Sequence, residues 1–257
     1  MAIFTIDYSS ECLNRRTSFT AILPIDSMNT AGYANPPKGG YRTVYLLHGF
    51  NGDHTDWYTH VNVKNWATKY NVAVIMPSGE NGQYVDQPIG YNNYGTLVGE
   101  EIVKVSRAMF PLSHKREDTY IAGLSMGGFG AMRNGLKYHK TFSKIGAFSA
   151  GLSRFEYGID DPRRNKITDA CLGDLKKAFK SDMNPRVLVN KLAKAGKTDQ
   201  KIWISCGTKD SLYDANVGFR ELLKEKGFDI TWDELPLAHE WAFWGDQLEK
   251  FGAWINK

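Results

Sequence analysis

The chain has 257 residues, of which 42% are hydrophobic and 23% are charged, which is ordinary for a soluble globular protein. Its length allows one large α/β domain with a full core, or two small ones. The net charge is only +4, and the basic residues are scattered among acidic ones. Such a distribution is typical of solvated faces and excludes a basic nucleic-acid footprint.

The cysteines and the N-terminus predict a location for the protein. Three cysteines, an odd number without C-x-x-C spacing, favour a reduced compartment, and Cys206 in an apolar strand is expected to be a small core residue. Residues Met1–Asp7 contain neither the basic nor the apolar segment of a secretory signal. No apolar run is long enough to cross a membrane. We therefore predict a cytoplasmic protein without a membrane-bound segment.

The first segments of the chain alternate apolar and polar residues as strands do, at 3–6 and 18–23. Pro24 ends the second segment, and the stretch from Ser27 to Gly40 is rich in Asn, Gly and Pro, which indicates a loop. Two strands joined by turns predict an antiparallel edge of a sheet.

Continuous apolar runs then predict strands that are buried on both faces, at 41–47 and 72–76. A helix is expected between them at 61–70, and a polar loop leads to another helix at about 94–109. A further strand runs into Ser125, and the helix behind this serine is expected to continue to Tyr138.

A change of pattern sets residues 152–198 apart. Leu152 to Thr198 is rich in Lys, Arg and Asp and has no obvious buried strand, so we expect a helical, cap-like insertion over the sheet. Around it the core pattern continues, with strands at 145–148, 201–206 and 228–235, a helix at 213–226 and a tryptophan-rich helix after His239. Strands that alternate with helices predict an α/β fold with a mostly parallel sheet covered on both faces. The insertion is expected to belong to one domain over residues 1–257.

Ser125 lies between Gly123 and Gly127 in the pattern G-x-S-x-G, where a predicted strand gives way to a helix. So tight a reversal strains the backbone of the central residue, and side chains two positions before and after it would collide. The helix N-terminus behind the serine supplies free N–H groups and partial positive charge. The motif alone is as typical of a glycine-rich turn as of a nucleophile, but its context favours the nucleophile.

Candidate partners of this serine follow two later strands. A serine nucleophile needs a base, and the base needs an orienting group. Asp210 comes just past one strand and His239 just past the next, so both are expected at the carboxyl edge of the sheet with Ser125. The order Ser, Asp, His is the one that this architecture uses. Asp214 is a close alternative to Asp210, and His48 is expected to be structural.

An oxyanion hole is expected at the backbone N–H groups of Met126, directly after the nucleophile, and of Phe50, after His48 and Gly49. No group of His, Asp and Glu residues has the spacing of a metal site, and the pair His54 and Asp56 is only a weak candidate. The two glycine patterns typical of nucleotide binding, G-x-G-x-x-G and G-x-x-x-x-G-K-[ST], are not complete in this sequence. We predict no metal and no cofactor.

Four motifs in combination resemble the esterase D or putative esterase branch of the α/β-hydrolases. They are Leu46-Leu-His-Gly49, Gly123-Leu-Ser-Met-Gly-Gly128, Cys206-Gly-Thr-Lys-Asp210 and His239-Glu-Trp-Ala-Phe-Trp244. The nearest members are bacterial tributyrin esterases and feruloyl (cinnamoyl) esterases. The resemblance implies the α/β-hydrolase fold, a triad of Ser125, His239 and Asp210, and an insertion over the acyl pocket. Some members act on formylglutathione thioesters, and relatives suggest a homo-oligomer.

The motifs and the resemblance predict a serine carboxylesterase that hydrolyses short-chain acyl or hydroxycinnamoyl (feruloyl) esters through an acyl-enzyme. Its partner is then a small-molecule ester. Trp57, Tyr58 and Trp241 are predicted to line the substrate pocket, where they could stack on a phenolic acyl group. The alternative places such aromatic residues in the core, and core is favoured for Trp244 and Trp254. An S-formylglutathione-type thioesterase or an acyltransferase on the same scaffold remain alternatives. A non-catalytic binding protein is disfavoured because all triad members are present.

Overall fold

Eight strands form one mixed sheet in the order β1-β2-β4-β3-β5-β6-β7-β8. The structure, a computed structural model, describes residues 2–25 and 36–257. The first two strands join the sheet antiparallel, and all pairs from β4 to β8 are parallel. The strands are β1 (Ala2–Ser10), β2 (Arg15–Leu23), β3 (Arg42–Leu47), β4 (Val72–Pro77), β5 (Thr119–Leu124), β6 (Lys144–Phe148), β7 (Lys201–Gly207) and β8 (Asp229–Leu235).

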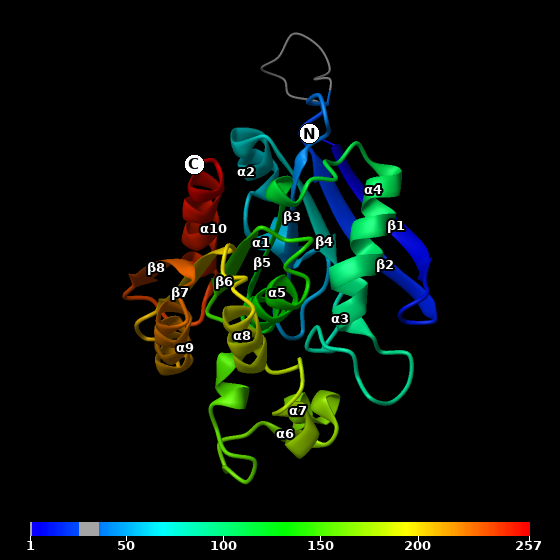
Figure 1. Cartoon of the computed structure of the whole chain (residues 1–257). Coiled ribbons are helices and arrows are strands. Elements are labelled where there is room, and N and C mark those ends of the chain that lie inside the picture. Colours follow the sequence, from blue (N-terminus) through cyan, green and yellow to red (C-terminus); the bar gives the residue numbers. More distant parts are fainter. Residues whose placement is uncertain (1, 26–35) are drawn as a thin grey trace.

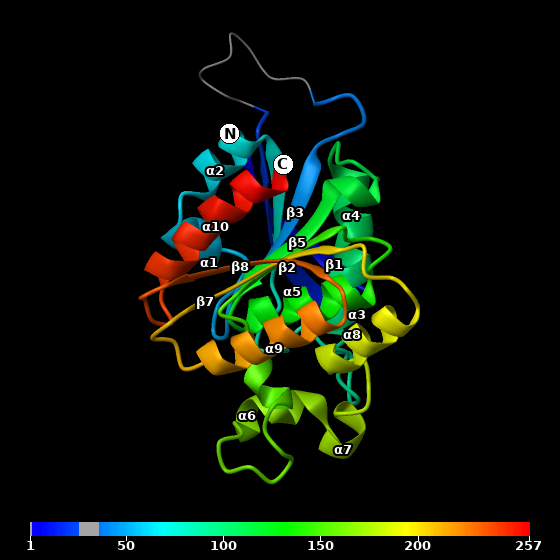
Figure 2. The same cartoon turned by 60° about the vertical axis from the view of Figure 1, so that its left-hand side comes forward.

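Helices cover both faces of this sheet (Figures 1 and 2). One face carries α1 (Asp56–His60), α2 (Val63–Tyr70) and α10 (Trp241–Ile255). The opposite face carries α4 (Ile102–Met109), α5 (Met126–Lys137), α8 (Pro185–Lys194) and α9 (Tyr213–Glu225). The short helices α3 (Tyr94–Thr96), α6 (Lys166–Asp169) and α7 (Leu175–Ala178) complete the set, and α6 and α7 lie beyond one edge of the layers (Figure 2).

The apolar core consists of two layers, one on each face of the sheet. Along β3, Val44 and Leu46 belong to the layer under α2 and α10, whereas Tyr45 and Leu47 belong to the layer under α5. All four side chains are fully buried. Because successive side chains of a strand point to opposite faces, a continuous apolar run supplies both layers. The prediction of doubly buried strands is thus confirmed.

Most of the predicted elements are present, with small shifts of their ends. The two N-terminal strands form the predicted antiparallel edge, and β1 alternates between exposed and partly buried residues. The helix predicted at 94–109 contains a π-helical turn at Leu97–Glu101. Between Leu152 and Thr198 the structure has helices and turns and no strand, as predicted. The last of these helices, α8, packs on the sheet face beside α5 and α9, so it belongs to the layer of the core and not to the cap. The predicted loop from Ser27 to Gly40 lies outside the described residues as far as residue 35.

No helix in residues 2–25 or 36–257 combines the length and the apolar character that a membrane span requires. The extent of the single domain stays a prediction from the sequence.

His48 ties the end of β3 to the loop behind β4. The backbone N–H of Gly79 donates to His48 Nε2 at 2.8 Å, and His48 Nδ1 lies 2.7 Å from the carbonyl oxygen of Gly49. Since Nε2 accepts a hydrogen bond, the proton of the neutral imidazole is assigned to Nδ1. The hydroxyl of Tyr84, which is also buried, donates to the His48 carbonyl at 3.1 Å. The predicted structural role of His48 is confirmed.

Acidification should destabilise the protein through His48. Burial lowers the pKa of this imidazole, so between the two pKa values the unfolded chain binds the proton more readily. The contribution of His48 to stability is therefore complete above the ordinary pKa of about 6.5 and decreases as the pH falls below it. From roughly pH 7 to pH 5.5 its slope should reach at most about 1.4 kcal/mol per pH unit.

Urea unfolding of the wild-type protein and the His48→Asn variant at both pH values checks this expectation. The variant should be less stable than the wild type at neutral pH, because it loses a buried hydrogen bond, and it should lose less stability on acidification. An equal loss in both proteins would contradict the assignment to His48.

Candidate active site

Ser125 occupies the turn between β5 and α5 with a φ of 55° and a ψ of −114°. Residues other than glycine rarely adopt this backbone conformation, so the neighbouring structure must hold Ser125 in it. The Ser125 N–H donates to the carbonyl of Phe148 at 2.9 Å, and its own carbonyl accepts from the N–H groups of Gly151 at 2.9 Å and Phe129 at 3.0 Å. Three backbone hydrogen bonds thus hold the strained serine between two parallel strands and a helix.

The two glycines that flank the serine are required by close backbone contacts. A Cβ atom at Gly127 would stand 2.4 Å from the carbonyl oxygen of Leu47 and 2.5 Å from that of His48. A Cβ atom at Gly123 would stand 2.5 Å from the carbonyl oxygen of Gly127. Backbone atoms in a sheet cannot move aside cheaply, so the collision expected from the sequence is present on both sides of Ser125.

The structure brings the three predicted side chains into one hydrogen-bonded chain. His239 Nε2 lies 2.9 Å from Ser125 Oγ, and His239 Nδ1 lies 2.7 Å from Asp210 Oδ2. Asp210 follows β7 and His239 follows β8, so both come from loops at the carboxyl edge of the sheet. The partner of His239 is Asp210 and not the alternative, Asp214. These two hydrogen bonds allow a proton to pass from Ser125 Oγ to the His239 imidazole.

The carboxylate of Asp210 is buried but well bonded. Its side chain has no exposed surface, whereas that of His239 is 36% exposed. Burial acts to raise the pKa of Asp210, but hydrogen bonds from His239, from the Leu212 N–H at 2.9 Å and from Ser149 outweigh it, and the pKa lies below its ordinary value. Asp210 is therefore an anion at neutral pH and can stabilise an imidazolium.

Two side chains that the sequence did not single out for this role support the hydrogen bonds between Ser125, His239 and Asp210. The ring of Trp244 meets the His239 imidazole edge-on, with centroids 4.9 Å apart. Trp244 was predicted to lie in the core, and its side chain is buried. The same ring also limits how the His239 imidazole can turn. Ser149, with a φ of 44°, directly follows β6 and bonds to Asp210. Only the position of Ser149 behind a strand could have indicated it.

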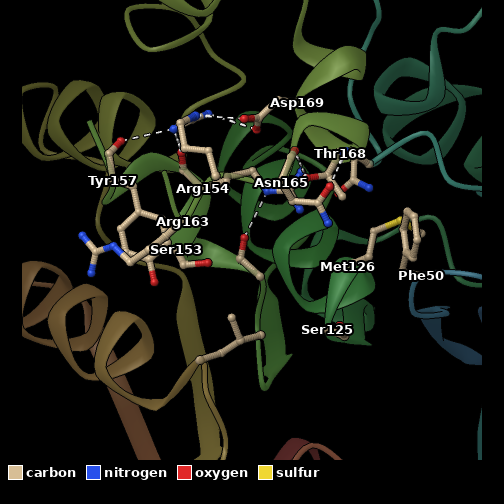
Figure 3. A pocket seen from close by; sticks show the side chains of 14 residues that line it. Phe50, Ser125, Met126, Ser153, Arg154, Tyr157, Arg163, Asn165, Thr168 and Asp169 are labelled. Atoms are coloured by element: carbon tan, nitrogen blue, oxygen red, sulfur yellow. Dashed lines mark hydrogen bonds and ion pairs between the residues drawn. The ribbon is translucent and has the colours of Figure 1, made fainter. Parts of the chain in front are cut away.

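A cavity of about 270 Å³ opens beside Ser125 (Figure 3). Phe50 and Met126 lie together at one side of the view, and Tyr157 and Arg163 lie at the opposite side. Within the described residues no carbonyl accepts from the N–H of Phe50 or Met126, so both groups remain open. The walls are formed by Phe50, Gln83, Ser125, Met126, Gly151, Ser153, Arg154, Tyr157, Arg163, Arg164, Asn165, Thr168, Asp169 and Leu212.

The aromatic pocket predicted from Trp57, Tyr58 and Trp241 is not found in these walls. Trp57 is 1% exposed, and its Nε1 donates to the Leu47 carbonyl at 2.9 Å. Trp241 meets Trp57 edge-on at 5.4 Å and stacks on His60 at 4.3 Å, while Tyr58 borders a separate hollow. These rings belong to α1 and α10 on the α2 side of the sheet, whereas the cavity lies under the insertion. None of the three lines the cavity beside Ser125, and a role for them in substrate binding stays a prediction.

The cap-side wall comes from the first part of the predicted insertion, residues 153–169. Its first turns are held by Arg164, which contacts both oxygens of Asp169 at 2.8 and 3.0 Å and donates to the Arg154 and Tyr157 carbonyls. Both charged side chains are nearly buried, at 5% and 11% exposure. A buried pair of this kind fixes geometry more than it adds stability. Short irregular helices leave no periodic pattern from which such a wall could be predicted.

Comparison with known proteins agrees with this geometry. Residues 10–254 match the family model described as "Putative esterase". The chain is 37% identical to the acetyl esterase of Caldicellulosiruptor saccharolyticus, an alignment that covers 100% of this chain and 99% of the relative.

Two solved structures from Staphylococcus aureus are similar over the whole chain. Fluorophosphonate-binding serine hydrolase F, with substrate bound, has a TM-score of 0.86 at 27% identity, covering 100% of this chain and 98% of the other. An S-formylglutathione hydrolase apoenzyme has a TM-score of 0.85 at 27% identity, covering 100% and 99%. The chain therefore belongs to the putative esterase family of the α/β-hydrolases and is a carboxylic ester hydrolase.

Proposed function

We propose that this protein hydrolyses short-chain acyl esters, acetyl esters above all, through an acyl-enzyme formed at Ser125. The observation that carries the proposal is the hydrogen-bonded chain from Ser125 through His239 to Asp210, which ends at an open cavity. A hydroxyl at hydrogen-bond distance from a base, with the base held by a carboxylate, is the arrangement that activates a serine.

In the acylation half of the reaction, Ser125 Oγ attacks the ester carbonyl carbon while its proton moves to His239 Nε2. Asp210 accepts the Nδ1–H bond of the imidazole and stabilises the positive charge. The carbonyl oxygen becomes an oxyanion, which the N–H groups of Phe50 and Met126 bind. When the tetrahedral intermediate collapses, the ester C–O bond breaks and His239 returns the proton to the leaving alcohol.

In the deacylation half, water takes the place of the alcohol. His239 removes one proton from the water as its oxygen attacks the acyl carbon. The bond to Ser125 Oγ then breaks, and the proton passes from His239 to the serine. The products are the free carboxylic acid and the original enzyme. Side-chain exposure of 36% at His239 leaves the imidazole within reach of solvent water.

A short acyl group is favoured by the size and the walls of the cavity. At about 270 Å³ the cavity is near the lower end of ligand sites. The rings that could have formed a stacking platform for a hydroxycinnamoyl group, Trp57 and Trp241, lie elsewhere. Phe50 and Tyr157 are the aromatic side chains in the described wall. The relative at 37% identity is named as an acetyl esterase, which points in the same direction.

Removal of the nucleophile should abolish turnover. The Ser125→Ala variant is expected to lose roughly four to six orders of magnitude in kcat, because no other group can form the acyl-enzyme. Hydrolysis of p-nitrophenyl acetate measures the loss, and an unchanged melting temperature shows that the variant is folded. Retained activity in the folded variant would contradict the role of Ser125.

Asp210 and Asp214 provide a matched pair of variants. Asp210→Asn is expected to lower kcat by roughly three to four orders of magnitude, because an amide cannot stabilise the imidazolium and favours the wrong tautomer of His239. Asp214→Asn should change kcat by less than about threefold, since Asp214 is not the partner of His239. Similar losses in both variants would argue against the assigned carboxylate.

A panel of substrates tests the acyl preference. The wild-type protein should have a higher kcat/KM for p-nitrophenyl acetate than for p-nitrophenyl butyrate, and methyl ferulate should be poorer than either. S-formylglutathione is included because a structural neighbour bears that activity in its name. A clear preference for methyl ferulate would overturn the short-chain proposal. Transfer of the acyl group to an added alcohol, in place of release of the free acid, would favour an acyltransferase. The cytoplasmic location and the homo-oligomer stay predictions.

A further inference from the structure

Arg154 places a cation with unused hydrogen-bond donors in the wall of the cavity. It lies in the turn Leu152–Phe155, close behind Gly151, whose N–H holds the Ser125 carbonyl. Its Nε donates to the Gly151 carbonyl at 3.2 Å, and its guanidinium lies over the ring of Phe129 at 4.6 Å. Its Nη1 atom is buried and finds no hydrogen-bond partner among residues 2–25 and 36–257 (Figure 3). The side chain is thus held in place while some of its donors stay unpaired.

The other charges of the cavity are already matched to one another. Arg163 makes two bonds to Asp161, at 2.9 and 2.6 Å, and Arg164 occupies both oxygens of Asp169. Asp169 also attracts the guanidinium of Arg154 but forms no ion pair with it. Within the part of the chain that the structure describes, Arg154 is left without a counter-ion.

An unpaired cation in such a place is costly, since a guanidinium that leaves water loses hydration that only a partner can replace. Burial of the charged guanidinium accordingly lowers the pKa of Arg154 to about 10. The group is still charged at neutral pH. A carboxylate brought into the cavity by a ligand would supply both the missing charge and the missing acceptors.

The guanidinium and the nucleophile are connected through Gly151. The carbonyl of Gly151 accepts from Arg154 Nε at 3.2 Å, and the N–H of Gly151 donates to the Ser125 carbonyl at 2.9 Å. Ser125 and Arg154 border the same cavity. A small ester attacked by Ser125 can therefore extend a charged group to Arg154.

We propose that Arg154 binds a carboxylate carried by the substrate and makes the protein selective for short esters in which one half is anionic. The proposal rests on the proposed esterase function and specifies its substrate class. Arg154 is a specificity-determining residue in this role. The carboxylate can belong to the acyl half, as in a half-ester of a dicarboxylic acid, or to the alcohol half.

Two matched pairs of esters separate these sources. The acyl pair is p-nitrophenyl hemisuccinate and p-nitrophenyl butyrate, and the alcohol pair is 4-acetoxybenzoate and its methyl ester. For each pair, selectivity is kcat/KM of the anionic ester divided by that of the neutral ester. We compare the wild type with Arg154→Met, which keeps a long side chain without charge, and Arg154→Lys, which keeps the charge. Arg220→Met, on α9 and paired with Glu221, gives the same change of net charge outside the cavity.

In at least one pair, Arg154→Met should lower the selectivity by about 10- to 100-fold, as expected for loss of a charge-assisted hydrogen bond. Arg154→Lys should restore part of it, and Arg220→Met should keep the wild-type ratio. The pair that responds identifies the half of the ester that faces the cap. Equal losses on anionic and neutral esters, or no loss in either pair, would overturn the proposal and leave Arg154 a structural residue over Phe129.

A second measurement uses the wild-type protein alone and does not depend on the folding of a variant. Raising the salt concentration from roughly 0.05 M to 0.5 M should weaken selectivity for the anionic ester, because salt screens the attraction that draws the free anionic ester to the cavity and kcat/KM includes that encounter. A ratio independent of salt would contradict the proposal. Failure to hydrolyse p-nitrophenyl acetate in a Ser125-dependent manner would instead overturn the esterase function itself, so the two failures are distinguishable.

Discussion

The close approach of backbone to backbone around Ser125 is the constraint on which the site depends. Gly127 lies against the carbonyls that end β3, and Gly123 lies against Gly127, so no side chain fits at either position. This contact forces the chain from strand to helix within one residue and holds Ser125 at a positive φ. It also leaves the Met126 N–H at an open helix N-terminus beside the loop of Phe50. The strained Ser125 and the open Met126 N–H therefore arise from one packing contact.

Parallel strands supply the rest of the triad. Because β5, β7 and β8 run in the same direction, the loops behind them emerge at one edge of the sheet. That topology brings Asp210 and His239 to Ser125 although 85 residues or more separate them from it in the sequence, counting from 125 to 210. The bonds that Leu212 and Ser149 give to Asp210 keep a buried carboxylate ionised. Rigid strands, not loops alone, thus set the distances that proton transfer needs.

Scaffold and insertion supply different parts of the site. Loops at the carboxyl edge of the sheet carry Ser125, Asp210 and His239, and residues 153–169 carry much of the cavity wall. In this wall Arg163 pairs with Asp161 and Arg164 pairs with Asp169, and Arg154 has no counter-ion within the described part of the chain. A buried pair generally contributes more to geometry than to stability. An unpaired cation at such a position is more easily understood as part of ligand binding than as part of the fold.

The sequence by itself determined the α/β fold and the antiparallel edge, and it indicated Ser125 and His239 as candidate reacting groups, because strand runs, glycine spacing and chain order are local or ordered features. It also indicated the structural His48. The choice of Asp210 over Asp214 came from the structure. Only the tertiary structure decided which side chains border the substrate. Trp57 lies in the core and Trp241 packs against it, whereas Arg154 and Tyr157, which border the cavity, come from short irregular turns without a periodic pattern. A pocket wall is set by the packing of distant segments, and no spacing along the chain encodes it.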